Sequence, residues 1–446
     1  MALEIPVTRI VVVGGGFGGV YTALALEALH TSSGCLDVTL ISRDNYLLVT
    51  PLLFEAGSGI LEPRHTVCPI RPLLRRTRFI VAGVTDIDLE KQIVHAVHEP
   101  DGHCYDVGYD QLVLAVGGVT NRTIIPGSEH AMVFKTLSDA ICLRNQVIDV
   151  LEQANVETDS VRKKHLLTMV IIGAGLVGVE LVGELTEFLR NICRTYENVR
   201  CEDFTIVLCE AGPVFLRELP PGLADFARRS LAKRGVDIRT NTPVAEITPK
   251  SVILSNGTTI SAAIILLCTG VAPNPLLAGL DLPEDHGRVI VDTTMRCPKR
   301  PEVWAIGDCA WIPSGDGRAY PQLAQHALRE ARVLARNIFR GVQGQPLQPF
   351  VYQTMGALAA LGHYSGVGRV MNIRVRGFLA WWIWRSYYLM QMPRWSRRLR
   401  IVIDWTVSLF FHNDVVKLVV ESPGVRESAG KLPAERPPKK MIYPHH

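Results

Sequence analysis

This chain of 446 residues has little net charge, few closely spaced cysteines and few long apolar runs. Its 47 basic and 43 acidic residues leave a net charge of +4, and no lysine-arginine run in the body indicates a nucleic-acid surface. The apolar stretches near the C-terminus fall short of the roughly 18 residues that a membrane-spanning helix needs. The N-terminus passes directly into a predicted strand, so we expect no signal peptide. The length predicts two or three domains.

The ten cysteines are scattered, and no two of them have CxxC or CxxxxC spacing. Zinc sites and local redox disulfides usually use such spacings. We therefore expect no metal site and no local redox disulfide. Reduced thiols in a cytosolic protein are the expected state.

A glycine loop follows the first predicted strand. The β-branched run at 9–13 leads into GGGFGG at 14–19, and an alanine- and leucine-rich helical stretch follows at 20–29. Strand, GxGxxG and helix in this order predict a dinucleotide-binding unit. Gly14 permits the tight turn, Gly16 lets a pyrophosphate approach the backbone, and Gly19 allows the helix to pack on the strand.

Two residues are candidates for the ribose contact of this first unit. The second strand, at 36–42, usually ends with an acid that binds a ribose hydroxyl. Here it ends with Ser42, followed by Arg43 and Asp44, and either Ser42 or Asp44 can bind the hydroxyl. The predicted cofactor-binding residues of this unit are Gly14, Gly16, Phe17, Gly18, Gly19, Ser42 and Arg43.

The same pattern returns at 168–185, with Gly173, Gly175 and Gly178 in the second GxGxxG. Its next strand ends at Glu210. A carboxylate there accepts hydrogen bonds from an adenosine ribose and repels a 2′-phosphate, so this unit should prefer NAD(H) to NADP(H). Two units predict two dinucleotides, of which the natural pairing is a permanently held FAD and an exchanging NADH.

Further downstream, Gly307 and Asp308 follow a short apolar strand. Alone they would indicate a turn. Beside two Rossmann units they resemble the second flavin motif, whose aspartate bonds the ribityl chain. The runs LVLAVGG at 112–118 and ILLCTGV at 265–271, the latter containing Gly270, resemble the strand-to-glycine crossings between two nucleotide domains. The predicted fold class is α/β, with two Rossmann-like dinucleotide-binding domains and a C-terminal membrane-associated region.

From about residue 8 to residue 420 the chain resembles a type II NADH:quinone oxidoreductase, within the flavoproteins that have two dinucleotide domains. NYLLVTPLLFEAGSG at 45–59, GVELVGEL at 178–185 and YPQLAQHALREARVLARNI at 320–338 carry this resemblance. Disulfide reductases of the same fold have a cysteine pair in the region of 45–59, and this chain has none there. The resemblance implies that NADH gives a hydride to FAD and that two electrons pass to a quinone, without proton pumping.

The resemblance also implies roles for individual residues. Thr50 and Pro51 are expected at the flavin ring, with Ala324 and Gln325 at its quinone end. Glu184 is expected between the nicotinamide and quinone sites, where it assists proton delivery. Glu180, in the same helix, and Gly270 complete the predicted cofactor-binding set. For Gln325 and Glu184 the alternatives are a routine helical glutamine and a solvated helix acid. His326 stands where the family often has a second glutamine, and it adds a titratable group there.

Four of the seven tryptophans and five arginines lie between Gly377 and Arg400. Pro393 divides this region into two predicted helices. In the second, apolar residues recur at helical spacing and polar ones line the other face, which predicts an amphipathic helix on a lipid surface. The alternative is a buried dimer interface or packing on the flavin domain. The expected partners are the membrane surface, ubiquinone or menaquinone and a second copy of the chain, with the protein on the cytoplasmic face of the inner membrane.

We predict these segments: an FAD domain at 1–120 and 265–345, a linker at 121–164, an NAD(H) domain at 165–264, a membrane-associated region at 350–420 and a disordered tail at 421–446. Two other functions remain open. A sulfide:quinone oxidoreductase would need cysteines flanking the flavin, where only Cys309 beside Asp308 is suggestive. A non-enzymatic flavoprotein could sense NADH and bind a partner protein through its tryptophan- and arginine-rich surface.

Overall fold

In the computed structural model, the first glycine loop follows the middle strand of a parallel sheet. The structure describes residues 7–33, 35–315, 317–362, 364–411 and 416–418. The sheet has the order β22-β9-β1-β2-β5, and every neighbouring pair is parallel. Its strands are β1 (Thr8–Val13), β2 (Leu36–Ser42), β5 (Arg78–Val81), β9 (Gln111–Leu114) and β22 (Val303–Ala305). Since β22 comes from much later in the chain, two distant segments build one sheet.

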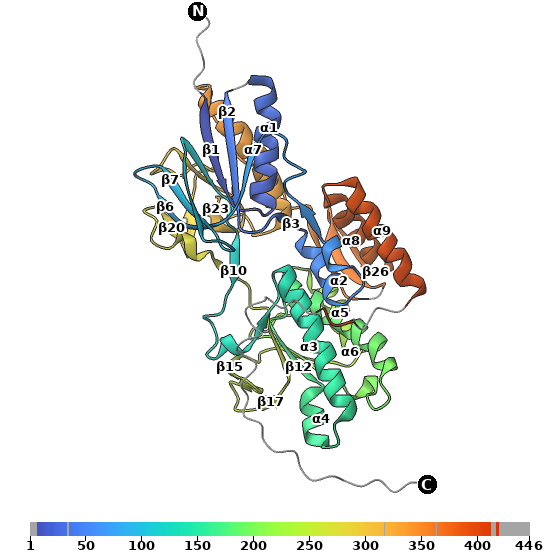
Figure 1. The fold of residues 1–446 in the computed structure, drawn as a ribbon. Coiled ribbons are helices and arrows are strands. Elements are labelled where there is room, and N and C mark those ends of the chain that lie inside the picture. Colours follow the sequence, from blue (N-terminus) through green and yellow to red (C-terminus); the bar gives the residue numbers. More distant parts are fainter. Residues whose placement is uncertain (1–6, 34, 316, 363, 412–415, 419–446) are drawn as a thin grey trace, which may run out of the picture. The chain divides into compact units, whose positions relative to one another are not determined.

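Two helices that are also far apart in sequence pack together beside this sheet. α1 (Phe17–Ser33) follows the glycine loop, and α7 (Ala324–Val342) lies along it (Figure 1). Ile10, Val12 and Leu40 are completely buried in the strands, in one core with Leu334 of α7. The strands read as continuous apolar runs because both faces of the sheet are covered.

A second parallel sheet follows the second glycine loop, with the order β11-β18-β12-β13-β14. Its strands are β11 (Met132–Val133), β12 (Thr168–Ile172), β13 (Thr205–Cys209), β14 (Val236–Arg239) and β18 (Ile264–Leu267). α5 (Leu176–Ile192) begins directly after the loop. The segment 121–164, expected as a linker, contains β11 and α3 (Leu137–Val156), and α3 packs in the same core as α5. β18 crosses the expected boundary at residue 264.

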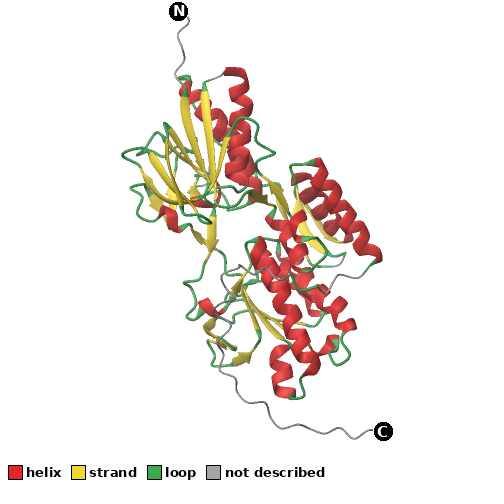
Figure 2. Cartoon of the chain, in the orientation of Figure 1, coloured by secondary structure: helices red, strands yellow, loops and turns green. Residues whose placement is uncertain are grey.

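Shorter strands and helices complete the two halves (Figure 2). β10 (Gly118–Thr120) pairs with β19 (Val271–Pro273), which follow β9 and β18, so this antiparallel pair marks the two crossings between the sheets. The other strands are β3 (Tyr46–Leu48), β4 (Val67–Pro69), β6 (Gly83–Asp88), β7 (Ile93–His98), β8 (His103–Gly108), β15 (Val244–Thr248), β16 (Ser251–Leu254), β17 (Thr259–Ser261), β20 (Glu284–Asp285), β21 (Arg288–Ile290) and β23 (Ala310–Trp311). The other helices are α2 (Leu53–Gly57), α4 (Ser160–Leu166), α6 (Pro221–Ala232) and the short 3-10 helices η1 (Thr50–Leu52), η2 (Pro63–His65), η3 (Ser128–His130), η4 (Cys193–Thr195), η5 (Cys201–Asp203), η6 (Pro275–Leu277) and η7 (Gly307–Cys309).

The C-terminal region begins with an antiparallel sheet and ends with two helices. These elements are β24 (Gly356–Ala360), β25 (Gly366–Val370), β26 (Ile373–Gly377), α8 (Phe378–Gln391) and α9 (Trp395–Phe410). Trp384, Met392 and Ile401 are buried in one cluster with Val49 and Leu52, so the inner faces of both helices pack on the segment around η1. None of the helices in the described part of the chain is long and apolar enough to cross a membrane.

The cysteines differ from the expectation at one place. Cys193 and Cys201 form a disulfide, with Cα atoms 5.9 Å apart, whereas the other eight are free. Their eight-residue separation is not a CxxC-type spacing. The turn between α5 and β13 brings the two residues together, within the Cα separation that a disulfide requires. Spacing alone could not reveal this turn.

Residues 1–415 form one compact unit and residues 416–446 a second. Of the second unit, only 416–418 are among the described residues. The tail at 421–446, which we expected to be disordered, therefore lies outside them.

Candidate active site

The first glycine loop has the close approaches that its motif predicts. Gly14 has φ +118°, and a Cβ atom there would lie 2.2 Å from the carbonyl oxygen of Ala115. A Cβ at Gly19 would lie 1.8 Å from the carbonyl oxygen of Gly14, so the helix contacts the loop backbone. At Gly16, by contrast, a Cβ would meet no atom within 4 Å. The backbone is therefore open at the one position where a pyrophosphate should approach the start of α1.

A large groove extends from this loop and has a volume of about 1420 Å³. Of the residues predicted to bind the first dinucleotide or the flavin ring, six line the groove: Gly14, Gly16, Phe17, Ser42, Arg43 and Thr50. Gly18, Gly19 and Pro51 are not among the lining residues, and neither are Asp308, Ala324 and Gln325. Ser42 and Asp44 both line the groove, so the choice between them as the ribose contact stays open. The groove exceeds the roughly 300–1,000 Å³ of ordinary ligand pockets, and it fits an elongated dinucleotide such as FAD.

Lys135 also lines this groove, and the sequence analysis did not identify it. Its pKa is lowered by burial, against the attraction of Asp308. Burial raises the pKa of Asp308, while Lys135 and Arg288 oppose the rise. A partly buried cation beside the aspartate of the second flavin motif suits a site for a phosphorylated cofactor. Lys135 lies just after a two-residue strand, and no local motif marks it.

The second glycine loop repeats the arrangement of the first. Gly173 has φ +106°, and a Cβ at Gly178 would lie 1.9 Å from the carbonyl oxygen of Gly173. Gly175 is the N-cap of α5. Glu210 accepts hydrogen bonds from the backbone N–H groups of Ala174, at 2.8 Å, and Gly212, at 3.0 Å. The predicted ribose-binding carboxylate is thus held beside the loop. Gly270, in the crossing after β18, has φ +98° and open space at its Cβ position.

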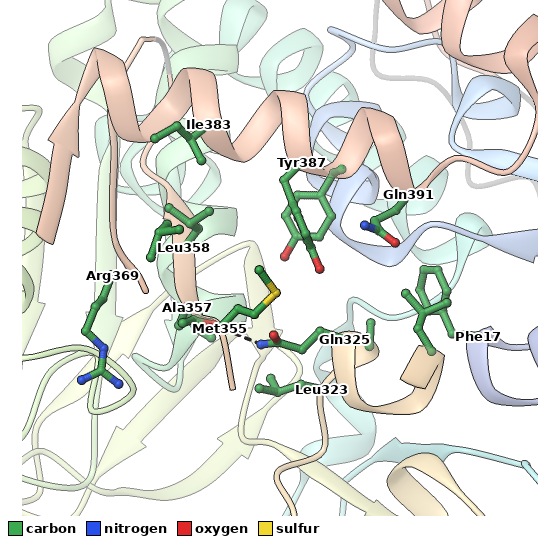
Figure 3. A pocket seen from close by; sticks show the side chains of 16 residues that line it. Phe17, Leu323, Gln325, Met355, Ala357, Leu358, Arg369, Ile383, Tyr387 and Gln391 are labelled. Carbon is green, nitrogen blue, oxygen red and sulfur yellow. Dashed lines mark hydrogen bonds between the residues drawn. The ribbon is translucent and has the colours of Figure 1, made fainter. Parts of the chain in front are cut away.

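A second, largely apolar pocket lies at the start of α7 (Figure 3). Ala324 and Gln325 line it, as does Leu176 at the start of α5. Phe17 lines both this pocket and the large groove, so the two cavities meet at the start of α1. Tyr387 and Gln391 of α8 line its other side. The pocket therefore brings together both glycine-loop helices, α7 and the C-terminal region.

The side chain of Gln325 is held by two hydrogen bonds. Its Nε2 donates to the carbonyl oxygen of Gly356 at 3.0 Å, and its Oε1 accepts from the hydroxyl of Tyr352 at 3.1 Å. His326, which stands where the family often has a second glutamine, is absent from the pocket lining. Its ring is 1% exposed and its Nε2 lies 3.0 Å from the hydroxyl of Thr354. Burial lowers the pKa of His326 to about 4, so the expected titratable group stays neutral near pH 7.

Glu184 is buried and is not a solvated helix acid. It is 3% exposed, and its Oε2 accepts from the Ser58 hydroxyl at 3.3 Å. Desolvation raises its pKa to about 8, and the charge of Glu55 acts in the same direction. A carboxyl group with such a pKa carries a proton near pH 7 and can release it.

Glu180, which we predicted to bind cofactor, forms its hydrogen bonds with the C-terminal region. Its Oε1 accepts from the backbone N–H of Ala360 at 3.0 Å and from the indole N–H of Trp384 at 2.8 Å. Burial raises its pKa to about 8. In the described structure this carboxyl group joins α5 to β24 and α8, and it lines neither cavity.

A buried ion pair ties the last two helices to the body. Glu55 is 1% exposed; its Oε1 accepts from Nε of Arg385 at 2.8 Å, and its Oε2 accepts from the indole N–H of Trp405 at 2.5 Å. The guanidinium of Arg385 lies 4.3 Å from the ring centroid of Trp381 and 4.7 Å from that of Trp405. Trp381 and Arg385 of the segment from Gly377 to Arg400, and Trp405 just beyond it, are therefore structural. The sequence analysis did not single out Glu55, although it lies within the family-like stretch at 45–59.

The outer faces of α8 and α9 expose apolar side chains. On α9 the exposed residues include Trp395, Leu399, Val402, Ile403 and Phe410, and on α8 they include Phe378, Leu379, Trp382 and Met390. Part of the polar face of α9 contacts the protein: Asp404 lies 2.5 Å from Nδ1 of His65, and Arg397 donates to the carbonyl oxygen of Arg64. Arg397 and Arg398 are bonded to backbone carbonyls, whereas Arg394 and Arg400 are exposed.

Comparison with known proteins identifies both parts of the chain. The family model described as Pyridine nucleotide-disulphide oxidoreductase matches residues 8–331. The model described as NDH2 C-terminal domain matches residues 354–414. The two matches together cover both parallel sheets and the C-terminal region with α8 and α9.

Similar proteins extend over nearly the whole chain. The chain is 30% identical to a probable NADH dehydrogenase of Dictyostelium discoideum, over 91% of this chain and 90% of that protein. It is 31% identical to the internal alternative NAD(P)H-ubiquinone oxidoreductase A1 of Arabidopsis thaliana, over 92% and 86%. The structure of NDH2 from Plasmodium falciparum in complex with NADH has the same fold, with a TM-score of 0.85 at 21% identity over 92% of this chain and all of that one. The chain thus belongs to the type II NADH:quinone oxidoreductases, within the pyridine nucleotide-disulphide oxidoreductase family.

Proposed function

We propose that this protein oxidises NADH and reduces a quinone through a bound FAD, without proton pumping. The observation that carries the proposal is the shared position of Phe17, which lines both the dinucleotide groove and the apolar pocket at Gln325. A flavin bound from the first glycine loop would meet both substrates near that position. FAD, when bound, supplies a two-electron carrier that accepts a hydride from NADH and returns two electrons to the quinone.

The protein's own residues bind and orient the reactants. The backbone at Gly16 receives the FAD pyrophosphate, and the loop before α5 receives that of NADH. Glu210 bonds the adenosine ribose of NADH and repels the 2′-phosphate of NADPH. We assign FAD to the sheet that contains β1 and NADH to the sheet that contains β12.

At the acceptor end, Gln325 offers an amide to a quinone carbonyl inside an otherwise mostly apolar pocket. Quinone reduction consumes protons, and Glu184, which lines neither of the two cavities, is the proposed source of one of them. It is buried in α5 and is protonated near pH 7, as the raised pKa indicates. The coulombic interaction with Glu55 also favours the protonated form of Glu184.

We propose that α8 and α9 lie on a membrane surface. Helices that leave so many large apolar side chains exposed need an apolar surface outside the chain. This face adjoins the pocket through α8, so a quinone with an isoprenoid tail can reach Gln325 from the lipid. Ubiquinone and menaquinone both fit this description. The cytoplasmic face of the inner membrane and a homodimer stay predictions from the sequence.

The sulfide:quinone alternative needs a reactive thiol beside the flavin. Cys309 is fully buried, and its thiol donates to the carbonyl oxygens of Leu114 and Ile306. Burial raises its pKa to about 12, which keeps it protonated and a poor nucleophile. These properties do not favour the alternative.

Purified protein should be tested for NADH oxidation with and without a ubiquinone or menaquinone analogue, beside its flavin absorbance spectrum. The enzyme should turn over continuously when the quinone is present. A long-lived reduced flavin that quinone does not reoxidise would instead support the NADH-sensing alternative. Sulfide-dependent quinone reduction without NADH would support the sulfide:quinone oxidoreductase alternative.

A further inference from the structure

We propose that Tyr352 is a positioning residue for quinone reduction, acting through Gln325. Tyr352 does not line the pocket. Its hydroxyl donates to Oε1 of Gln325, which does line the pocket. This inference rests on the proposed function of the pocket and concerns the orientation of its one amide on α7.

The orientation of the amide follows from the chemistry of its two partners. The carbonyl oxygen of Gly356 can only accept a hydrogen bond, so the Gln325 nitrogen must face it. The amide oxygen then faces the Tyr352 hydroxyl, which must donate. Burial raises the pKa of Tyr352, so its proton is present throughout the physiological range. The Gly356 carbonyl thus excludes the flipped amide, and the hydrogen bond from Tyr352 further stabilises the observed orientation.

Among the residues that the structure describes, one N–H of the Gln325 amide has no hydrogen-bond partner. Nε2 has two hydrogens, and the bond to Gly356 takes one of them. Since Gln325 lines the pocket, its second N–H is available to a ligand there. A quinone presents carbonyl oxygens, which accept such a bond. A flipped amide would present its oxygen instead and repel the carbonyl.

Tyr352 is itself held from three directions. The Arg329 guanidinium stacks on its ring, 4.4 Å from the centroid, and the His326 ring meets it edge-on at 5.0 Å. Its backbone N–H donates to the Tyr320 hydroxyl at 3.3 Å. This support explains the burial of His326, which braces the tyrosine and takes no part in the pocket lining. A rigid donor behind Gln325 fixes its amide before the quinone arrives, so less freedom is lost on binding.

The test is a double-mutant cycle in stopped flow with NADH and a ubiquinone analogue. Tyr352→Phe should leave flavin reduction by NADH unchanged and slow flavin reoxidation by the quinone roughly three- to tenfold, the range of one neutral hydrogen bond. In a Gln325→Leu background, the same substitution should slow reoxidation no further, because no amide remains to be oriented. Binding of a non-reducible quinone analogue to the oxidised protein should weaken in parallel.

Tyr320→Phe is the matched control. It removes a hydroxyl from the same aromatic cluster and loosens the same segment, but it does not touch the Gln325 amide. Reoxidation should then stay within about twofold of the unmodified protein, since a lost bond to a half-buried backbone group acts on stability and not on the amide. Flavin absorbance confirms that each variant is folded and loaded.

The outcomes separate this inference from the proposed function. If Gln325→Leu slows reoxidation but Tyr352→Phe does not, the positioning role is wrong and the quinone site stands. The role is also wrong if Tyr352→Phe slows reoxidation equally in both backgrounds, or if Tyr320→Phe has the same effect. If Gln325→Leu itself leaves reoxidation unchanged, the quinone does not bind at this pocket and both proposals fall.

Discussion

Replacing Arg385 by methionine should loosen the attachment of the C-terminal helices. The substitution keeps an apolar side chain of similar length but removes the cation between Trp381 and Trp405. Glu55, which is 1% exposed, then retains the Trp405 indole but loses its ion-pair partner. Leaving one charge of a buried pair without its partner costs about 3–5 kcal/mol.

The assay is amide hydrogen exchange of peptides from α9. Trp405 must separate from Glu55 when α9 opens locally. The unpaired charge of Glu55 in the closed state therefore lowers the free energy of this local opening. Each 1.4 kcal/mol is tenfold in an equilibrium, so protection should fall on the order of a hundred- to a few thousandfold, down to the limit of an open helix. Peptides from β16, whose Val252 and Leu254 lie in a different core, should keep their protection.

A paired substitution tests the reasoning. Glu55→Gln combined with Arg385→Met removes both charges, and the glutamine can still accept from the Trp405 indole. Since a neutral pair leaves no buried charge, most of the protection should return. Protection that is unchanged in Arg385→Met, or equally low in the double variant, would show that the ion pair does not hold α9.

The remaining predictions concern the cofactor, pH and the membrane. Glu210→Ala should narrow the preference for NADH over NADPH by about 1–3 kcal/mol in kcat/KM, whereas unchanged ratios would remove Glu210 from the ribose site. Burial raises the pKa of Glu184 from 4.5 to about 8, so its contribution to stability is full below pH 4.5 and is lost as pH rises through 8. Glu184→Gln, which cannot ionise, should therefore gain stability relative to the unmodified protein between pH 5 and 8.5 in chemical denaturation, and a constant difference would contradict the buried neutral carboxyl. Combined Trp395→Ser, Leu399→Ser and Ile403→Ser should release the protein from liposomes in flotation while keeping FAD and activity with water-soluble acceptors. Continued flotation would place the membrane contact elsewhere.

Much of the fold could be predicted because its signals are local in sequence. Each glycine loop is a strand, a turn and a helix within about twenty residues, and the close contacts at Gly19 and Gly178 arise inside that span. Glu210 lies 36 residues from Ala174, and the parallel pairing of β12 with β13 places it beside its loop. The assignment of the segments was less accurate where distant pieces meet, as for α3, which lies in the expected linker yet packs in the second core.

The tertiary structure alone decided which face of each C-terminal element is used. Periodicity predicted an amphipathic α9, but only packing turned Asp404 toward His65 and left Leu399 exposed. The disulfide between Cys193 and Cys201 likewise depends on a turn that spacing does not specify. Most of all, Tyr352, Gln325 and Phe17 come from separate parts of the chain, and only their meeting in space makes an oriented amide beside a dinucleotide groove. Local propensity determines elements, whereas a site that joins four helices depends on long-range contacts that no single stretch of sequence contains.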